Sequence, residues 1–237
     1  MKIIVLSITP YKEKDGIIDA ISENGDISFL ARGIFDPKSK NAALNNTLVI
    51  ADVDFSDGKY KYPLLKSSTV IENPMKVDND FSYLSSLLFI AESTKVLLQD
   101  EEKELIFNSL VDAIIALKKA EQPWEILLAY TAKLLTIGGY EFEVNHCVFC
   151  GTTKDIVTFS FKDGGFVCRN CIAEDTERDL NKTQMLLIRS AFNASNMGRL
   201  DYKCTKDDAL IVLNKFIEFI TESYGVRLKS AKLINKM

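Results

Sequence analysis

Four of the five cysteines form two C-x2-C pairs within one short stretch, residues 146–171. The pairs are Cys147 with Cys150 and Cys168 with Cys171, and seventeen residues separate them. This spacing is typical of a zinc site, because each C-x2-C turn directs two thiolates at one point and a hairpin can bring the turns together. Four sulfurs would close a tetrahedron around Zn²⁺ and leave no position for water. The spacing therefore predicts a structural zinc bound by Cys147, Cys150, Cys168 and Cys171.

Other chemistries of the cysteines fit less well. A catalytic zinc keeps one position open, a redox C-x-x-C normally follows a strand in a thioredoxin-like unit, and disulfides need an oxidising compartment. The alternative is a protein that descends from a zinc-binding ancestor and kept the four cysteines but no longer binds zinc. The single histidine, His146, adjoins the first pair, and we expect it beside the metal site or in solvent. Cys204 stands alone, and we expect a small buried apolar role for it.

The residues between the pairs predict a zinc ribbon over 146–172. Apolar residues alternate with polar ones from Val157 to Phe161, and "KDGG" supplies the return turn. The charged side chains of this stretch are Lys154, Lys162, Arg169, Asp155 and Asp163. Four thiolates with one Zn²⁺ add two negative charges, so the ribbon carries about one net negative charge. A phosphate-binding surface needs the opposite sign, so we expect the ribbon to be scaffold.

The first 72 residues predict five strands, near 3–8, 16–22, 26–33, 47–55 and 59–71. Asn24-Gly25 is a two-residue hairpin signal, and Asp57-Gly58 predicts a turn before the fifth strand. A polar link over 36–46 separates the third strand from the fourth. This pattern fits a small barrel of the OB type. A sandwich fragment or an SH3-like barrel fits nearly as well.

After residue 80 the apolar period changes from two to about 3.6, which indicates helices. We expect them over 81–99, 101–120, from Pro123 to the glycines at 138–139, 182–196 and 206–223. The fold class is therefore α+β, with an N-terminal five-stranded OB-type β-barrel followed by an all-α domain that carries the inserted zinc ribbon. We place the domains at 1–74 and 75–237.

Composition narrows the function classes. The formal net charge is −4 and the pI is about 5.2, which argues against a wholly basic nucleic-acid coat protein. The chain has a single histidine and no Gly-rich phosphate-binding motif, so we expect that it is not an enzyme. No apolar run is long enough to span a membrane and no secretion signal is evident, so we expect a cytoplasmic protein.

Four stretches, in order along the chain, resemble the RecO family of bacterial recombination mediators. They are "FLARGIFDPKSK", "AYTAKLLTIGGYEFEVNHCVFCG", "FSFKDGGFVCRNC" and "YGVRLKSAKLI". The resemblance implies an OB barrel, a helical body with a zinc ribbon, and binding and annealing of single- and double-stranded DNA. It also implies nucleoid association and partnership with RecR and with the acidic tail of the single-stranded-DNA-binding protein (SSB). Together these proteins load the recombinase RecA on SSB-coated DNA.

The resemblance also implies DNA contacts at particular residues. Arg32, Lys38 and Lys40 match the basic positions of the family's barrel turn, where we expect phosphate contact; ordinary solvated charge is the alternative. Phe35 and Asp36 stand where the family usually has more cations, which predicts weaker binding unless Phe35 stacks on a base. The basic tail contributes the further candidates Arg227 and Lys229, followed by Lys232 and Lys236, with solvated charge at a helix end as the equal alternative. A protein–protein adaptor with little direct DNA binding is the alternative function.

Overall fold

The computed structural model describes residues 1–56, 61–98, 102–195, 200–202 and 204–237. These residues divide into two compact units, Met1–Lys119 together with Met237, and Ala120–Lys236. The turn predicted at Asp57-Gly58 lies outside the described residues.

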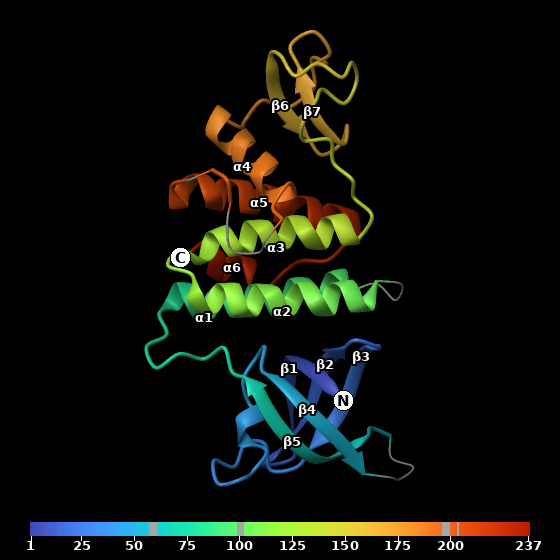
Figure 1. The fold of residues 1–237 in the computed structure, drawn as a ribbon, viewed down its shortest axis with the longest axis vertical. Helices are drawn as coiled ribbons and strands as arrows, with labels where there is room; N and C mark the ends of the chain where they lie inside the picture. The colour runs from blue at the N-terminus through green and yellow to red at the C-terminus, as the bar shows by residue number, and fades with distance from the viewer. Residues whose placement is uncertain (57–60, 99–101, 196–199, 203) are drawn as a thin grey trace. The chain divides into compact units, whose positions relative to one another are not determined.

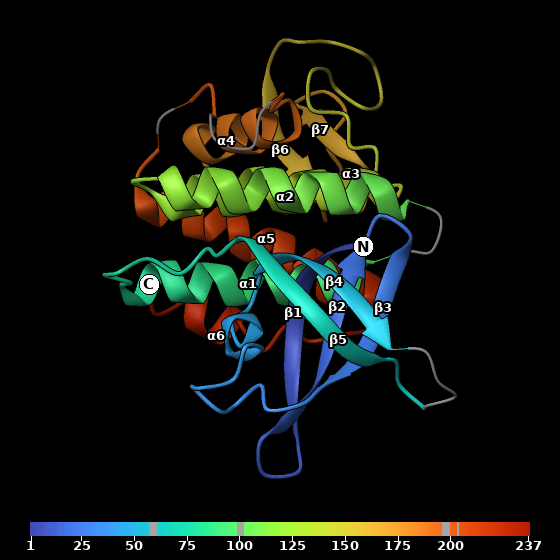
Figure 2. The ribbon, with the colours of Figure 1, turned by 60° about the horizontal axis from the view of Figure 1, so that its bottom comes forward.

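A closed five-stranded barrel forms the first part of unit 1 (Figure 1). Its strands are β1 Lys2–Tyr11, β2 Asp15–Ser22, β3 Gly25–Ala31, β4 Ile50–Ser56 and β5 Leu64–Glu72. They pair in the order β1-β2-β3-β5-β4, and β4 returns to β1. Only the β3–β5 pairing is parallel among the named strand pairs, and Figure 2 shows β5 crossing in front of β1 and β2. This closed topology confirms the OB-type barrel.

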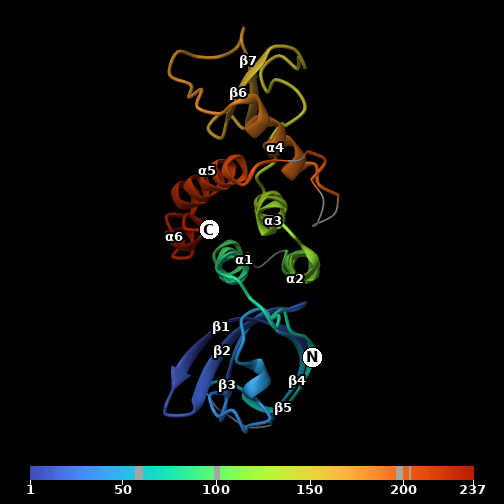
Figure 3. The same ribbon diagram turned by 90° about the vertical axis from the view of Figure 1, so that its left-hand side faces the viewer.

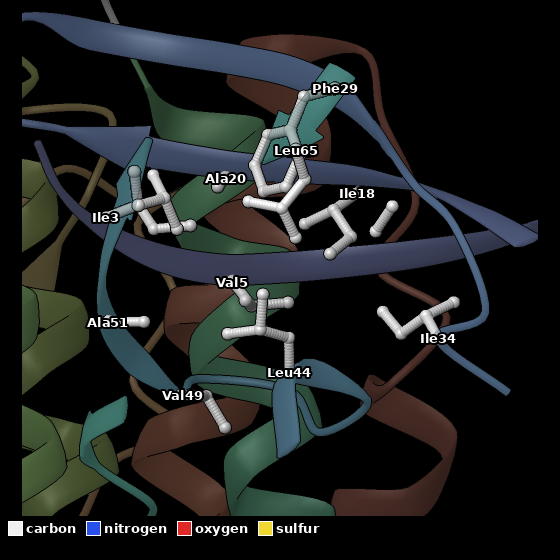
Figure 4. Close-up of a cluster of buried hydrophobic side chains, with 12 residues drawn as sticks. Ile3, Val5, Ile18, Ala20, Phe29, Ile34, Leu44, Val49, Ala51 and Leu65 are labelled. Carbon is white, nitrogen blue, oxygen red and sulfur yellow. The ribbon is translucent and has the colours of Figure 1, made fainter. Parts of the chain in front are cut away.

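The barrel interior is filled by alternate residues of the strands (Figure 4). Ile18, Phe29 and Ala31 are fully buried there, and the ring of Phe55 meets that of Phe29 edge-on at 5.1 Å. The link between β3 and β4 adds Leu44 to the same core from a short 3-10 helix, Ala42–Leu44. The first part of the chain thus forms a hydrophobic core of its own.

The hairpin between β2 and β3 turns one residue earlier than the sequence predicts. Ser22 pairs with Gly25, so Glu23 and Asn24 form the turn rather than Asn24-Gly25. The Ser22 hydroxyl donates to the Gly25 carbonyl at 3.0 Å and accepts from the Asn24 N–H at 3.2 Å. Gly25 has φ +117°, and a Cβ there would lie 2.5 Å from the Lys103 side chain. Glycine is therefore favoured by its positive φ and not by a central position in the turn, since the end of the Lys103 side chain could move aside for a Cβ.

Two helices, α1 Phe81–Leu97 and α2 Lys103–Lys119, complete unit 1 (Figure 3). Asp80 caps α1 by accepting from the Tyr83 N–H at 2.7 Å. Helix α1 packs against β1, and α2 packs against β2 and β3. The Lys95 ammonium of α1 lies 2.6 Å from Asp19 of β2. Both helices thus group with the barrel in one compact unit, and the domain boundary at 74/75 stays a prediction.

Unit 2 contains four helices and one hairpin among its described residues. They are α3 Pro123–Ile137, β6 Ile156–Ser160, β7 Gly165–Cys168, α4 Lys182–Phe192, α5 Lys206–Tyr224 and α6 Ala231–Ile234. Helix α3 begins with proline at N1, α4 begins with an Asn181–Gln184 capping box, and Thr205 caps α5. Helices α3, α4 and α5 pack against one another pairwise. Helix α4 ends at Phe192, four residues before the predicted end, and no described helix is long and apolar enough to cross a membrane.

Candidate metal centre and nucleic-acid interface

Two tight turns position the four cysteines of the ribbon. In the first turn, the Gly151 N–H donates to the Cys147 carbonyl at 2.8 Å, and Gly151 takes the left-handed conformation that lets the chain reverse. In the second turn, Cys168 ends β7, and the Cys171 N–H donates to its carbonyl at 3.1 Å. The antiparallel β6–β7 hairpin carries the chain between the turns.

The four sulfur atoms converge on one point. All lie within 4.8 Å of one another, and the sulfurs of Cys150 and Cys168 are 3.7 Å apart. A tetrahedral zinc with Zn–S bonds of about 2.3 Å requires sulfur separations of about 3.8 Å. All five cysteines of the chain are free thiols. Cys147, Cys150, Cys168 and Cys171 therefore lie close enough to bind a metal ion, as their spacing predicts.

The electrostatics of the cluster favour a bound cation. Burial disfavours the Cys147 thiolate, but backbone N–H groups, first that of Cys168 at 3.4 Å from the sulfur, outweigh burial and lower its pKa to about 6. Hydrogen bonds with Cys150 and Cys168, together with the nearby Cys147 thiolate, raise the pKa of Cys171 to about 12. Four thiolates this close repel one another, and a divalent cation at their centre would offset that repulsion.

An aromatic cluster fixes the ribbon to the helices of unit 2. Phe142, just before the first cysteine pair, has its ring centroid 5.6 Å from Phe159 of β6, 5.3 Å from Phe192 of α4 and 5.3 Å from Phe219 of α5. The backbone adds to this, since the Phe166 N–H donates to the Glu143 carbonyl at 2.9 Å. These contacts make the ribbon part of the packed body, in agreement with a scaffold role.

His146 and Cys204 take no part in the cluster. His146 is half-exposed, and its ring nitrogen Nδ1 lies 3.5 Å from Glu143. Cys204 is partly rather than fully buried, and burial followed by the charges of Glu125 and Asp208 raises its pKa to about 11.

The basic turn of the barrel, residues 32–40, is held by its own hydrogen bonds. The Asn41 side chain donates to the Arg32 carbonyl at 2.9 Å, and the Lys38 N–H donates to the Asp36 carboxylate at 3.0 Å. The Lys14 ammonium lies 2.9 Å from the same carboxylate and, with the Lys38 N–H, lowers the pKa of Asp36. Asp36 is therefore charged but paired, which reduces its opposition to a phosphate at this turn.

The predicted DNA contacts lie on both units. Arg32, Lys38 and Lys40 are exposed on unit 1, although the Lys40 ammonium also donates to the Lys66 carbonyl at 3.3 Å. Phe35 is partly buried against the barrel core, which leaves only part of its ring for stacking. Arg227 and Lys229 are exposed on unit 2. Their roles in DNA contact stay predictions.

A hollow of about 360 Å³ lies beside Arg32 on the outer face of the barrel, and the sequence interpretation missed most of its residues. Its lining includes three aliphatic side chains, Ile17, Leu30 and Leu64. The other lining residues are two tyrosines and two cations: Tyr11, Tyr62, Arg32 and Lys61. We call this site the tyrosine hollow. The alternation of buried and exposed positions in β2 and β3 could have indicated that Ile17 and Leu30 face outward. No signal in the sequence indicates that Tyr11 and Tyr62 lie together.

Comparisons with known proteins agree with this geometry. The family model "Recombination protein O C terminal" matches residues 78–232. The chain belongs to the RecO family. Relatives named "DNA repair protein RecO" cover 99% of this chain: one from Halalkalibacterium halodurans is 25% identical with 93% of its own length covered, and one from Bacillus pumilus is 28% identical with 92% covered. Membership in the RecO family supports a role in DNA repair and recombination, and it confirms the resemblance seen in the sequence.

Proposed function

We propose that this chain is a DNA-binding recombination mediator that anneals complementary strands and helps to load the recombinase on SSB-coated single-stranded DNA. The observation that carries this proposal is an OB-type barrel with exposed cations on a fixed turn, in a chain of the RecO family. Such cations bind phosphates without regard to sequence. That suits a protein that must act wherever a gap arises. The proposal involves no catalytic residue and places the protein in the bacterial cytoplasm, at the nucleoid.

The partners belong to the same proposal. They are single- and double-stranded DNA, RecR, and the C-terminal tail of the single-stranded-DNA-binding protein. A tail that is acidic with an apolar end needs a site that combines lysine or arginine with apolar side chains.

We also propose that the metal is zinc and that its role is structural. Zinc takes four thiolates in a tetrahedron, and the converging sulfurs of Cys147, Cys150, Cys168 and Cys171 fit that coordination. When bound, the ion would join the two turns of the ribbon, while the aromatic cluster around Phe142 holds the ribbon to the helices. One zinc per chain in freshly purified protein supports the proposal, and protein without metal contradicts it.

The test of the mediator function is annealing of two complementary oligonucleotides at low salt, with binding to RecR and to the SSB tail peptide measured in parallel. Annealing together with binding to both partners supports the proposal. A chain that neither anneals nor binds either partner contradicts it.

A protein–protein adaptor is the second candidate, favoured by the acidic pI of about 5.2 and by Asp36 within the basic turn. A salt titration separates the two functions. Phosphate contacts lose affinity steeply as salt rises, whereas binding of a partner through apolar surface changes little. Partner binding with no salt-sensitive binding to DNA would favour the adaptor.

A further inference from the structure

Helix α1 carries apolar side chains all round, although only part of its surface is covered. One side packs against β1 of the barrel. The large apolar side chains that stay exposed are Phe81 at 50%, Leu84 at 37% and Leu88 at 44%. No charged residue occurs in the sequence between Asp80 and Glu92. A helix that is apolar all round is normally buried on every side, so the open face of α1 indicates a surface that another molecule covers.

The exposed apolar residues of α1 form a stripe along the helix. Phe81, Leu84 and Leu88 follow one another at intervals of three and then four residues, which places them on one side of the helix. Val77, in the segment that leads into α1, is 98% exposed and lies four residues before Phe81. We call these four residues the α1 stripe. Intervals of three and four residues are those of the seam between two packed helices, so the stripe suits another helix as its partner.

The exposed charges at the two ends of the α1 stripe differ in sign. Asp78 and Asp80 are exposed where α1 begins, and Lys95 is exposed in its last turn. Glu92, one turn before Lys95, is partly buried and already interacts within the chain. If a second α1 lay antiparallel to the first, Lys95 of each copy would approach Asp78 and Asp80 of the other. A parallel pair would bring like charges together, so the charges favour the antiparallel arrangement.

We propose that the α1 stripe is the surface through which two copies of this chain form a two-fold symmetric dimer, with their α1 helices packed antiparallel. A two-fold interface uses the same patch on both copies, and the patch must therefore complement itself. The α1 stripe does so, because apolar side chains meet apolar side chains and the acidic end of one copy meets the basic end of the other. Leu84, in the middle, would contact Leu84 of the second copy, and Phe81 would contact Leu88. The dimer does not depend on DNA, so the inference goes beyond the proposed function.

The size and charge of the α1 stripe bear on the strength of the dimer and on the choice of partner. Four side chains from each copy make a small interface, so we expect a weak dimer with a dissociation constant in the micromolar range. An acidic peptide with an apolar end is the competing occupant. It would meet Asp78 and Asp80 at one end of the stripe, and within α1 it would find a single cation, Lys95. A second copy offers both signs of charge and therefore fits better.

The experiment measures the molar mass of the full chain by sedimentation equilibrium at concentrations from about 1 to about 100 µM. The wild type is expected to change from monomer to dimer over this range. Leu88→Lys places a charge within the stripe and is expected to weaken self-association about tenfold or more. The matched control is Leu105→Lys, at a leucine of α2 that is 51% exposed outside the stripe, and it is expected to associate like the wild type. Unfolding midpoints show whether each variant is folded.

A pair of variants at Leu84 tests the two-fold geometry. Leu84→Lys and Leu84→Glu are each expected to be monomeric, because like charges would meet where the two copies of residue 84 face each other. An equal mixture of the two variants is expected to form a mixed dimer, because the introduced ammonium of one would meet the introduced carboxylate of the other. A mixture that stays monomeric would overturn the inference.

Three other outcomes would also overturn it. They are a wild type that stays monomeric over the whole range, a dimer that Leu88→Lys leaves unchanged, and a dimer that Leu105→Lys weakens as much as Leu88→Lys does. A labelled aspartate-rich peptide that ends in phenylalanine tests the competing occupant. Peptide binding to a monomeric wild type that Leu88→Lys abolishes would assign the stripe to such a peptide and not to a second copy. The proposed function stands in each case, because annealing and DNA binding are measured separately.

Discussion

Replacing Cys147 with serine removes one of the four thiolates that converge in the ribbon. A bound metal would join Cys150 to Cys168, which are 18 residues apart in the sequence, and so would close a loop of that length. For a cross-link of this span, the loss of chain entropy in the unfolded state alone is worth about 3 kcal/mol. The binding energy of the metal is also folding energy, so the total effect exceeds this value.

We therefore expect Cys147→Ser to lose the metal and to lower the free energy of unfolding of unit 2 by at least about 3 kcal/mol. The single tryptophan, Trp124, lies at the start of α3 in unit 2, so its fluorescence during denaturant unfolding follows this unit. The matched control is Cys204→Ser. That thiol is partly buried outside the cluster, and its replacement should cost less than about 1 kcal/mol and leave the metal in place.

Metal content is measured on the same samples by elemental analysis. A Cys147→Ser protein that keeps one metal per chain and unfolds at the same denaturant concentration as Cys204→Ser would refute the reasoning. So would a chelator that removes the metal from the wild type without lowering its stability.

Three further predictions concern the supporting structure. Phe142→Ala should destabilise unit 2 by about 3 kcal/mol, because its partly buried ring contacts β6, α4 and α5, while the metal content stays unchanged; thermal unfolding with metal analysis checks both. Thr205→Ala removes the cap of α5 and should cost about 1 kcal/mol, measured by denaturant unfolding against Thr205→Ser. Burial raises the pKa of Asp19. Hydrogen bonds, first that from Lys95, lower this pKa by more than burial raises it, so the net shift is downward. Because the folded-state pKa is lowered, the Asp19 carboxylate stabilises the fold above its unfolded pKa of about 3.9, and this stability is lost as the pH falls through the folded pKa. The free energy of unfolding should therefore fall less steeply below about pH 4 in Asp19→Asn than in the wild type, as measured by acid unfolding.

Local patterns in the sequence predict the metal cluster and most helix limits. The two C-x2-C turns are each four residues long, so their geometry depends on few neighbours. The cap of α5 is equally local, because the hydrogen bond that Thr205 accepts reaches only to the N–H of Asp208, three residues on. The end of α4 at Phe192 has no such marker, and the predicted limit was four residues too long.

Contacts between distant residues could not be predicted in the same way. Tyr11 and Tyr62 share the tyrosine hollow only because β5 pairs with β3 in this barrel. Asp36 pairs with Lys14, 22 residues away in the sequence, and this pairing reduces the opposition of the Asp36 charge to a phosphate at the basic turn. The shift of the β2–β3 turn accompanies the hydrogen bonds of Ser22 and the approach of Lys103 to Gly25. Each depends on the register of paired strands or on a packed helix.

The central claim is that the barrel binds DNA through its exposed cations. Its most direct test is the affinity of the full chain for a single-stranded oligonucleotide over a range of salt concentrations. Arg32, Lys38 and Lys40 would give a slope of log K against log salt of about −2 or steeper, since each phosphate contact on a single strand contributes about −0.7. Replacing all three with alanine should make the slope shallower by about 2. A wild-type affinity that does not change with salt, or a slope that the triple variant leaves unchanged, would contradict the claim.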